Sequence, residues 1–549
     1  MLSARRLYAL GLVSLLAFSA CTKAGETTAE GGRSNAWTTP HVLSMADGSG
    51  DINSLNPHLA TFQNVFYMAE MTMAWLVKWD EHNNPIPELA TEVPTRANGG
   101  VSADGLTITY HLRKGVKWSD GVPFDADDVV FSTKAVLNPA NNEVGRIGWD
   151  QIVKIDEPDK YTVVYHLKKP FSGFVETFFS TAGANPCVLP KHILGNLPNI
   201  NNAPYNALPV GIGPFKFQSW QRSEQVVMVA NPLYFRGRPK LDKVVMKLIP
   251  DRNTMLSLVQ AHSIDMWFLV PGKYLAAVTA VPGYSIIRQP SYFYNHYDFN
   301  LTRPAVKDLV VRQALRYALD RQELRHKIAH DVGIVQDVTT PINAPYAVKD
   351  LGVTPFDLDK ANALLDGAGW VRGPDGIRSK NGVKLLLDLA TISGSADQDQ
   401  AIELIRSNWK KIGVDLSVHH YPAAVMFAPM QDGGIIYSPN KWDVVAVALG
   451  NDAIGDLSAP YSCGSFPPNG QNDPRWCNKR AEAAMQAVFG QFDQADRNKS
   501  VHVVEEELVK DVPTIVTAIR EDIFAFNSDL KNWHPNAISP FDSMMDVDI

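Results

Sequence analysis

Two hydrophobic periodicities alternate along this chain, and their order constrains the fold more than any other feature. Between residues 357 and 450, apolar residues recur at helical spacing after Asp357 and again over 402–412, and strand-like alternation follows at 414–418. Helices that alternate with strands are typical of an α/β unit. Period-two alternation over 106–112 and 161–167 predicts half-buried strands, so the first part of the chain is expected to be richer in β-structure.

The length and charge of the chain exclude several classes of protein. At 549 residues it exceeds what one core normally supports, so more than one domain is expected. Its 45% hydrophobic and 20% charged residues argue against a disordered chain and a polytopic membrane protein. The formal net charge of −7 argues against a nucleic-acid partner. Gly211 and Gly213 are followed by Pro214 rather than by a helix, so they do not predict a dinucleotide loop, and no cofactor is predicted.

The N-terminus reads as a targeting segment. Arg5 and Arg6 precede an apolar run over 7–18, which is shorter than the ~20 residues of a membrane-spanning helix and fits a secretory signal. The sequence FSAC at 18–21 resembles a bacterial lipobox, although Phe18 stands where Leu is usual. We therefore expect residues 1–20 to be a signal peptide, Cys21 to be lipidated, and 21–36 to be a flexible tether. An ordinary cleaved signal with an incidental cysteine is the alternative.

The three remaining cysteines suggest one disulfide. Cys463 and Cys477 flank a stretch rich in Gly and Pro that can fold back on itself, and an exported protein favours their pairing. Cys187 would then be a buried apolar residue. A catalytic pair of Cys187 with His192 is the weaker reading, because no orienting group stands nearby in the sequence.

Several segments resemble the family 5 extracellular solute-binding proteins, the oligopeptide and dipeptide receptors of ABC importers. The strongest runs from SADGLTITYHLRKGVKWSDG to PFDADDV over 102–129. The others are SLNPH at 54–58, GIGPF at 211–215, VRQAL at 311–315 and YALDR at 317–321, and the match extends to WHPN at 533–536. Most of these residues are structural: Asp120-Gly121 suits a turn and Asp125 suits a helix N-cap.

The resemblance implies an α/β, two-lobe, periplasmic-binding-protein-like fold of the type II, cluster C kind, with an extra subdomain in the first lobe. The implied first lobe is 37–75, 210–297 and 516–549, the extra subdomain is 76–209, and the second lobe is 298–515. Hinge crossings are expected near Asp298-Phe299-Asn300 and near Thr517. The lobes would close over a ligand.

The family places an acidic residue for the ligand's amine in the second lobe. The match puts Asp452 at this position, after Trp442-Asp443 and a buried strand, with Asp456 as the alternative register. A carboxylate closed into a cleft favours a cationic partner. The other implied cleft residues are Gly450, Asn451, Thr61, Phe62, Gln63, Trp267, Phe268, Tyr294, Tyr421 and Trp442, with Tyr292 and Tyr297 beside the hinge.

The implied function is an exported receptor that captures peptides and delivers them to an ABC permease and its ATPase. It is expected to be a monomer, lipid-anchored to the outer face of the cell membrane or in the periplasm. The alternative is the same fold with an oligosaccharide, an opine or a metal chelate.

His419 and His420 are neighbours in a strand and point to opposite faces, so they do not predict a metal site. A secreted hydrolase is the third hypothesis, but no His-Glu-x-x-His or Gly-x-Ser-x-Gly pattern supports an enzyme.

Overall fold

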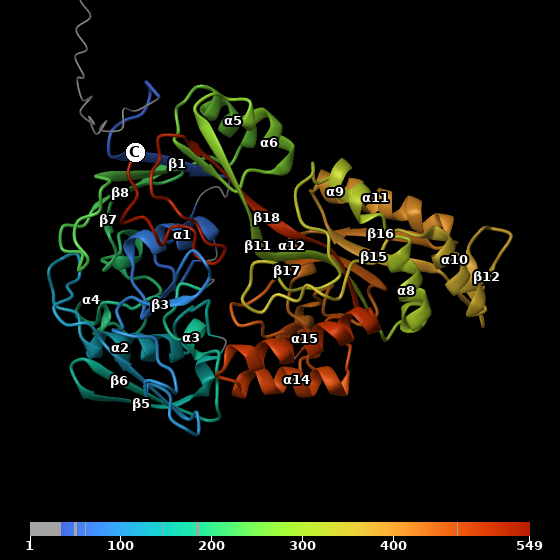
Figure 1. The fold of residues 1–549 in the computed structure, drawn as a ribbon, viewed down its shortest axis with the longest axis horizontal. Coiled ribbons are helices and arrows are strands. Elements are labelled where there is room, and N and C mark those ends of the chain that lie inside the picture. Colours follow the sequence, from blue (N-terminus) through green and yellow to red (C-terminus); the bar gives the residue numbers. More distant parts are fainter. Residues whose placement is uncertain (1–34, 49–51, 61, 147, 183–185, 469) are drawn as a thin grey trace, which may run out of the picture.

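One large sheet runs through the computed structural model and joins its two lobes (Figure 1). The structure describes residues 35–48, 52–60, 62–146, 148–182, 186–468 and 470–549. The sheet has ten strands in the order β16-β15-β17-β11-β18-β10-β1-β9-β8-β7. Their bounds are β1 Val42–Asp47, β7 Phe215–Gln221, β8 Gln225–Ala230, β9 Lys243–Leu248, β10 Met266–Phe268, β11 Tyr284–Phe299, β15 Leu386–Ile392, β16 Asp415–Tyr421, β17 Val444–Gly450 and β18 Thr514–Asn527.

The long strands β11 and β18 belong to both lobes. They pair antiparallel, and their register shifts between Pro290 and Tyr294. On one side of the shift β18 pairs with β10, and on the other side β11 pairs with β17. The expected hinge positions Asp298 and Thr517 lie on these two strands. The two lobes are therefore joined by continuous backbone hydrogen bonding.

The first lobe consists of β1 and β7–β10 with helices on the sheet. Its core includes Met45, Met246 and Phe524 from three different strands. At the start of β7, the glycines of GIGPF let the chain pass close to the end of α1, since a Cβ on Gly213 would lie 2.5 Å from the carbonyl oxygen of Met71. This contact fixes α1, whose first residue reaches the cleft. The helices are α1 Gln63–Thr72, α5 Arg252–Gln260 and α6 Gly272–Thr279.

A side domain, defined by β2–β6 and α2–α4, lies below the first lobe in Figure 1. The predicted strands are confirmed: β4 and β6 pair, with buried Ile108 opposite buried Tyr165. Asp125 caps α2 in a capping box with Asp128, also as predicted. The elements are β2 Val77–Trp79, β3 Pro85–Pro87, β4 Thr107–His111, α2 Ala126–Leu137, η1 Trp149–Gln151, β5 Ile152–Asp159, β6 Thr162–Leu167, α3 Phe174–Thr177, α4 Lys191–Leu194 and η2 Pro204–Ala207.

The second lobe packs helices around β15, β16 and β17. Asp308 and Asp357 cap α8 and α10, and α10 confirms the helix predicted after Asp357. The helix expected over 402–412 begins earlier, because the Ser395 hydroxyl accepts the Gln398 N–H and starts α11 at Ala396. The elements are α7 Pro304–Lys307, α8 Leu309–Tyr317, α9 Arg321–Lys327, α10 Leu358–Gly367, β12 Val371–Arg372, β13 Arg378–Lys380, β14 Val383–Lys384, α11 Ala396–Lys411, α12 Ala423–Met426, η3 Met430–Asp432, α13 Ser458–Tyr461, α14 Lys479–Gly490 and α15 Gln494–Asp511.

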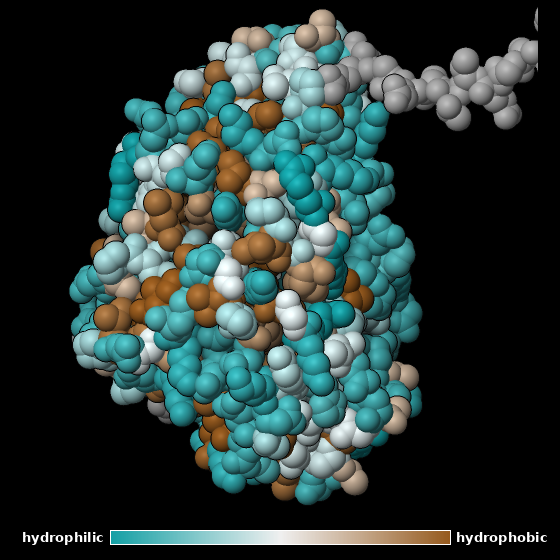
Figure 2. Space-filling view, turned by 90° about the vertical axis from the view of Figure 1, so that its left-hand side faces the viewer, coloured by the Kyte–Doolittle hydropathy of each residue, from teal (hydrophilic) through white to brown (hydrophobic). Residues whose placement is uncertain are grey.

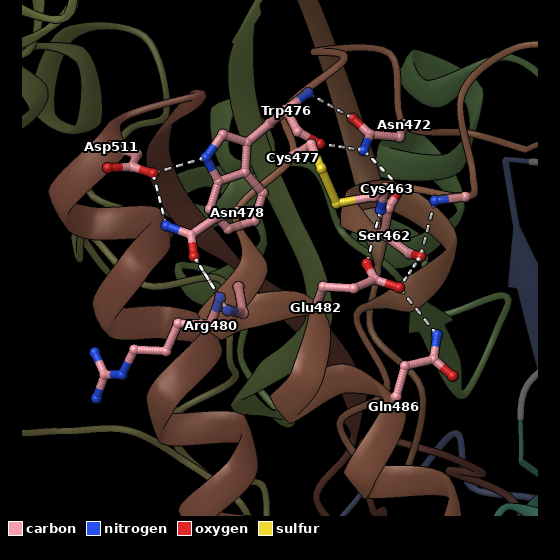
Figure 3. The surroundings of a disulfide bond; sticks show 12 residues. Ser462, Cys463, Asn472, Trp476, Cys477, Asn478, Arg480, Glu482, Gln486 and Asp511 are labelled. Carbon is pink, nitrogen blue, oxygen red and sulfur yellow. Dashed lines mark hydrogen bonds between the residues drawn. A yellow bond between two sulfur atoms is a disulfide. The ribbon is translucent and has the colours of Figure 1, made fainter.

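A disulfide joins Cys463 and Cys477 in the second lobe, with the two Cα atoms 4.7 Å apart (Figure 3). The Glu482 carboxylate on α14 accepts the backbone N–H of Cys463, and the Asn472 side chain donates to the carbonyl oxygens of Ser462 and Trp476. The disulfide and these hydrogen bonds attach the loop to the start of α14.

The surface formed by the first lobe and the side domain is mainly hydrophilic, with apolar residues gathered near its middle (Figure 2). Exposed apolar side chains of the side domain include Leu197 and Leu208. Among the described residues, no helix has both the length and the apolar content needed to cross a bilayer.

Candidate functional site

A cavity of about 1020 Å³ lies between the lobes, where β11, β17 and β18 meet. All three parts of the molecule contribute lining residues: the first lobe through the start of α1, the side domain through α3, and the second lobe through the loop after β17. Its volume is at the upper end of the range for small-molecule sites, ~300–1000 Å³. The predicted residues that line it are Gln63, Gly450, Asn451 and Asp452, together with Tyr292 and Tyr297.

The loop after β17 holds Asp452 firmly. Gly450 ends β17, and Asn451 is fixed because its backbone N–H donates to the Tyr292 carbonyl at 2.8 Å and its side chain donates to the Thr339 carbonyl at 2.9 Å. Asp452 Oδ1 accepts three backbone N–H bonds, from Ile454, Gly455 and Asp456, at 3.1, 2.5 and 2.7 Å. The carboxylate therefore has a fixed position at the cavity.

The electrostatic surroundings of Asp452 favour a positive charge. Burial, and after it the neighbouring carboxylate of Asp456, raise the pKa of Asp452 well above its ordinary value, although the three backbone N–H groups act in the opposite direction. Burial also raises the pKa of Asp456, against its hydrogen bonds with Ser458. An ammonium at this position would stabilise the ionised form.

Phe62, the predicted residue next to Gln63, precedes α1 and packs against the first-lobe core. Thr61 lies outside the described residues. Gln63 begins α1 and is exposed at the cavity.

The structure corrects the expected aromatic walls at Trp267 and Phe268. Both lie in β10, which is covered on both edges by β1 and β18, and their side chains are buried in cores on either side of the sheet. The next residues along the chain, Leu269 and Val270, reach the cavity instead.

Tyr294, Trp442 and Tyr421 also pack in cores rather than lining the cavity. Tyr294 is fully buried, and its hydroxyl lies 3.1 Å from that of Tyr461. The Trp442 indole N–H donates to the carbonyls of Ile435 and Ile436, and Tyr421 packs in the same cluster. Aromatic side chains at strand ends fill the space beneath the sheet here, which is the commoner use of large apolar groups.

Several lining residues were not predicted from the sequence. The most notable is Glu176, which α3 brings from the side domain to the loop of Asp452. His296, Arg520 and Asp522 line the cavity from the two shared strands, and Arg252 and Lys273 line it from the first lobe. None of them lies in a motif, and only the fold brings them together.

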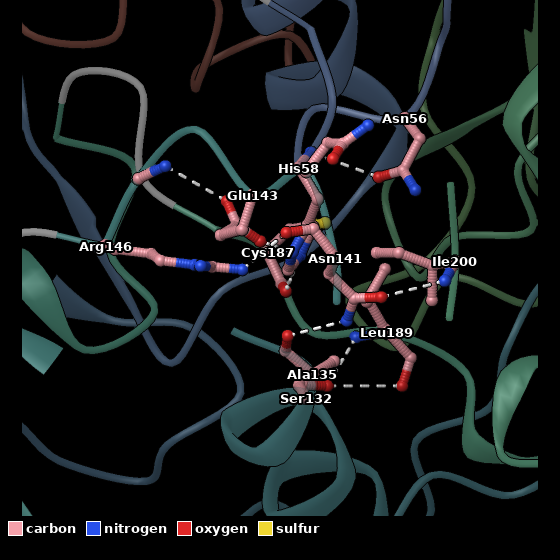
Figure 4. Close-up of polar contacts among 12 residues, drawn as sticks. Asn56, His58, Ser132, Ala135, Asn141, Glu143, Arg146, Cys187, Leu189 and Ile200 are labelled. Atoms are coloured by element: carbon pink, nitrogen blue, oxygen red, sulfur yellow. Dashed lines mark hydrogen bonds and ion pairs between the residues drawn. The ribbon is translucent and has the colours of Figure 1, made fainter. Parts of the chain in front are cut away.

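Cys187 and His192 do not form a catalytic pair. The His192 imidazole binds Asp120 at 2.8 Å. Cys187 is buried, and its backbone carbonyl lies 2.8 Å from Nε2 of His58 (Figure 4). Burial acts to lower the pKa of His58, but the Glu143 carboxylate, 2.5 Å from Nδ1, and the Cys187 carbonyl raise it well above its ordinary value. This buried His–Glu pair joins three loops and is structural.

His419 and His420 bind different carboxylates. His419 Nε2 lies 3.1 Å from Asp388, and His420 Nε2 lies 2.9 Å from Asp399. The two imidazoles therefore do not converge on one point.

Two lobes that share crossing strands and enclose a ligand-sized cavity define a class of protein, the solute-binding proteins that close around their ligand. Within that class the assignment is direct. The chain belongs to the bacterial extracellular solute-binding proteins of family 5, whose model, described as the middle of the family's domain, matches residues 84–467. The predicted family and fold class are confirmed, and the family consists of solute-binding proteins rather than enzymes.

Individual relatives differ in their ligands. The oligopeptide-binding protein AppA of Bacillus subtilis (strain 168) is 28% identical over 461 residues, which cover 81% of this chain and 80% of AppA. The structure of AppA with a nonapeptide has a TM-score of 0.74 at 24% identity and covers 93% of this chain and 99% of that one. NikZ from Campylobacter jejuni with Ni(L-His) has a TM-score of 0.72 at 26% identity, with 91% and 96% covered. AgaA from A. tumefaciens R10 with agropinic acid has a TM-score of 0.71 at 23% identity, with 92% and 97% covered.

Proposed function

We propose that this protein is the extracytoplasmic receptor of an ABC importer, that it captures peptides by lobe closure, and that it delivers them to a membrane permease driven by an ATPase. The observation that carries the proposal is Asp452, a fixed and largely desolvated carboxylate that lines the interlobe cavity. A peptide's terminal ammonium is the complement of such a group.

Three basic side chains of the cavity suit the terminal carboxylate of a peptide. Arg252, Lys273 and Arg520 line the same cavity. Arginine and lysine bind carboxylates by charge-assisted hydrogen bonds, so a zwitterionic ligand finds partners for both its termini. The similarity to the oligopeptide-binding protein AppA supports this ligand class.

The second candidate is an opine or a metal chelate in the same cavity. It is favoured by the similarity to AgaA and NikZ, which were solved with agropinic acid and Ni(L-His). An oligosaccharide is less well matched, because several charged groups line the cavity beside its aromatic and neutral polar side chains.

A thermal-shift panel tests the ligand class. The protein is unfolded and refolded to remove trapped ligand, then scanned with random pentapeptides, their N-acetylated copies, agropinic acid, Ni(L-His) and oligosaccharides. A ligand at 100 times its Kd stabilises by about 2.7 kcal/mol, which moves the midpoint by several degrees. We expect a shift with free peptides that acetylation removes. A shift with agropinic acid or Ni(L-His) alone would support the second candidate.

The proposal includes export and anchoring. Cys21 would be lipidated after removal of residues 1–20, and residues 21–36 would tether a monomeric body at the outer face of the cell membrane or in the periplasm. Cys21→Ser should move the protein from the membrane fraction to the soluble exported fraction, whereas Cys187→Ser should leave it at the membrane. If both variants fractionate like the unmodified protein, Cys21 does not carry the anchor.

We also propose the boundaries of the three parts. The first lobe is 37–75, 210–297 and 516–549, the extra subdomain is 76–209, and the second lobe is 298–515. The hydrophobic clusters centred on the first lobe, the side domain and the second lobe support this division, and the side-domain cluster also takes in Ala69, Met73 and Ile212 of the first lobe.

A further inference from the structure

The side domain contacts the second lobe at the loop after β17, which contains Asp452. The Glu176 carboxylate of α3 accepts hydrogen bonds from the backbone N–H groups of Ala453 and Ile454. Nearby, the Ser172 N–H donates to the Phe489 carbonyl at the end of α14, at 2.7 Å. Val175 packs in the core that contains Ile454. These contacts place Glu176 directly beside the loop that begins with Asp452.

Glu176 and Asp452 therefore both line the cavity, Glu176 from the side domain and Asp452 from the second lobe. Burial, then the charges of Asp452 and Asp456, raise the pKa of Glu176 well above its ordinary value. Two basic groups act on these acids. The Arg497 guanidinium, which donates to Gln491 and Gln494, acts on Glu176 and Asp452, and Lys169 acts on Asp456. The hydroxyls of Tyr292 and Tyr346 also lie within the field of the pair. Two carboxylates that accept N–H groups of the same short loop disfavour a second negative charge there.

A third polar group points to a ligand at this place. Tyr292 lines the cavity and is 6% exposed, yet its hydroxyl has no hydrogen-bond partner among the described residues. The charges of both Glu176 and Asp452 act on this hydroxyl. A buried hydroxyl without a partner carries a desolvation penalty that a ligand donor can remove.

We propose that Glu176 is a second ligand-binding carboxylate, and that a primary ammonium held between Glu176, Asp452 and the Tyr292 hydroxyl is what lets the side domain close onto the second lobe. A primary ammonium has three N–H donors, which matches three acceptors from three elements. A secondary ammonium has one donor fewer and leaves one acceptor unmatched. This inference rests on the proposed peptide function and narrows it to ligands with a free primary amine.

The same geometry makes closure depend on charge. Without a ligand, closing the cleft brings two carboxylates together, and a proton must take the place of the ammonium. The ligand-free protein is therefore expected to close in acid and to open as the pH rises through the raised pKa range of the pair. A bound primary ammonium keeps it closed at high pH and displaces the proton.

Two measurements test the inference separately from the proposed function. Small-angle X-ray scattering gives the radius of gyration of the ligand-free protein between pH 5 and 8, for the unmodified chain, for Glu176→Gln and for the exposed side-domain control Glu157→Gln. We expect the unmodified chain and the control to expand as the pH rises, and Glu176→Gln to stay compact. No expansion of the unmodified chain, or equal expansion of Glu176→Gln, would overturn the inference, whatever the ligand is.

The binding arm uses random pentapeptides with free, N-methylated and N-acetylated amino termini. We expect Glu176→Gln to weaken binding of the free mixture roughly 10- to 100-fold, the range of one charge-assisted hydrogen bond, and N-methylation to weaken binding to the unmodified chain. Equal affinities of Glu176→Gln and the unmodified chain for the free mixture would overturn the role of Glu176. If the unmodified chain binds no peptide, the proposed function fails, and the scattering result still decides whether the acid pair controls closure.

Discussion

Two groups of buried and half-buried carboxylates in this molecule have opposite surroundings. The first joins the side domain to the first lobe: the Lys78 ammonium lies 3.1 Å from Glu88 and 3.3 Å from Asp542, and all three side chains are almost fully buried. The second lies in the cleft, where Asp452 and Glu176 accept bonds from backbone N–H groups of one loop. Buried acids with an internal cation stabilise the fold, whereas acids that face a cavity are available to a cation from outside.

The first group is complete within the protein. Asp542 also accepts the hydroxyls of Thr181 and Ser539, at 2.9 and 2.7 Å. Burial acts to lower the pKa of Lys78, but Asp542 and Glu88 raise it above its ordinary value, so Lys78 remains charged. Glu70 lies beside them and accepts the Phe541 N–H, and burial together with Asp542 raises the pKa of Glu70 well above its usual range. No role in ligand binding follows for these residues.

Removing the internal cation should produce the largest effect. Lys78→Met leaves Glu88 and Asp542 buried without their positive partner, and breaking a buried pair in this way typically destabilises by about 3–5 kcal/mol. Urea denaturation measures the loss. The control is Lys168→Met, whose exposed pair with Asp150 at 3.7 Å should contribute about 0–1 kcal/mol. If the two variants lose the same stability, the buried group is not a structural ion pair.

A third buried acid, Glu505 on α15, tests whether a raised pKa lowers stability where hydrogen bonds, rather than a buried lysine, hold the carboxylate. Burial raises the pKa of Glu505 to about 7, although it accepts hydrogen bonds from Thr339 and Thr340. Because the folded protein holds this proton longer than the unfolded chain, stability is lost as the pH rises from about 4.5 to about 7, by up to about 3 kcal/mol.

Glu505→Gln removes this titration while it keeps one acceptor oxygen. Its stability, relative to that of the unmodified chain, should therefore improve as the pH rises through this range, and equilibrium denaturation at several pH values measures the difference. Parallel stability curves for the two proteins between pH 4.5 and 7 would contradict the assignment to Glu505.

The same substitution of an acid by its amide should lower stability in the first group and lower peptide affinity in the second. Asp542→Asn removes a charge that Lys78 needs, so it should lower stability by about 2 kcal/mol and leave peptide affinity unchanged. Asp452→Asn keeps the acceptor for three N–H groups and relieves repulsion with Asp456, so stability should be unchanged or higher, while affinity for free-amine peptides falls at least about 10-fold. Denaturation and titration calorimetry on both variants give the four numbers. A loss of stability in Asp452→Asn with unchanged affinity would show that its role is structural.

The fold was predictable from the sequence where the hydrophobic pattern of one helix or strand is enough to identify that element. Alternation over 106–112 and 161–167 follows from the pleat of a strand, so Ile108 and Tyr165 are predictable as residues of one buried face. The helical spacing after Asp357 likewise predicts α10 from its own residues. Where the cap itself was overlooked, at Ser395, the predicted helix began too late.

The candidate site was predictable only in part, because a cavity is a property of several elements at once. Asp452, which lines the cavity, was predicted because its segment resembles a family with an acid at that place. Trp267 and Phe268 were misplaced, since nothing in β10 itself shows that β1 and β18 cover both its edges. Glu176 lies in a short helix without periodicity, far from Asp452 in the sequence, and only the docking of the side domain on the second lobe brings the two together.

The central claim, that the cleft acids bind the ligand's primary ammonium, is tested most directly by competition in one vessel. Refolded protein is dialysed to equilibrium against equal amounts of random pentapeptides with free and with N-acetylated amino termini, and mass spectrometry identifies the peptides retained. The account predicts that free-amine peptides are retained by at least about 10-fold over their acetylated copies, since acetylation removes the charge and two of the three donors. Equal retention of acetylated and free peptides would contradict it.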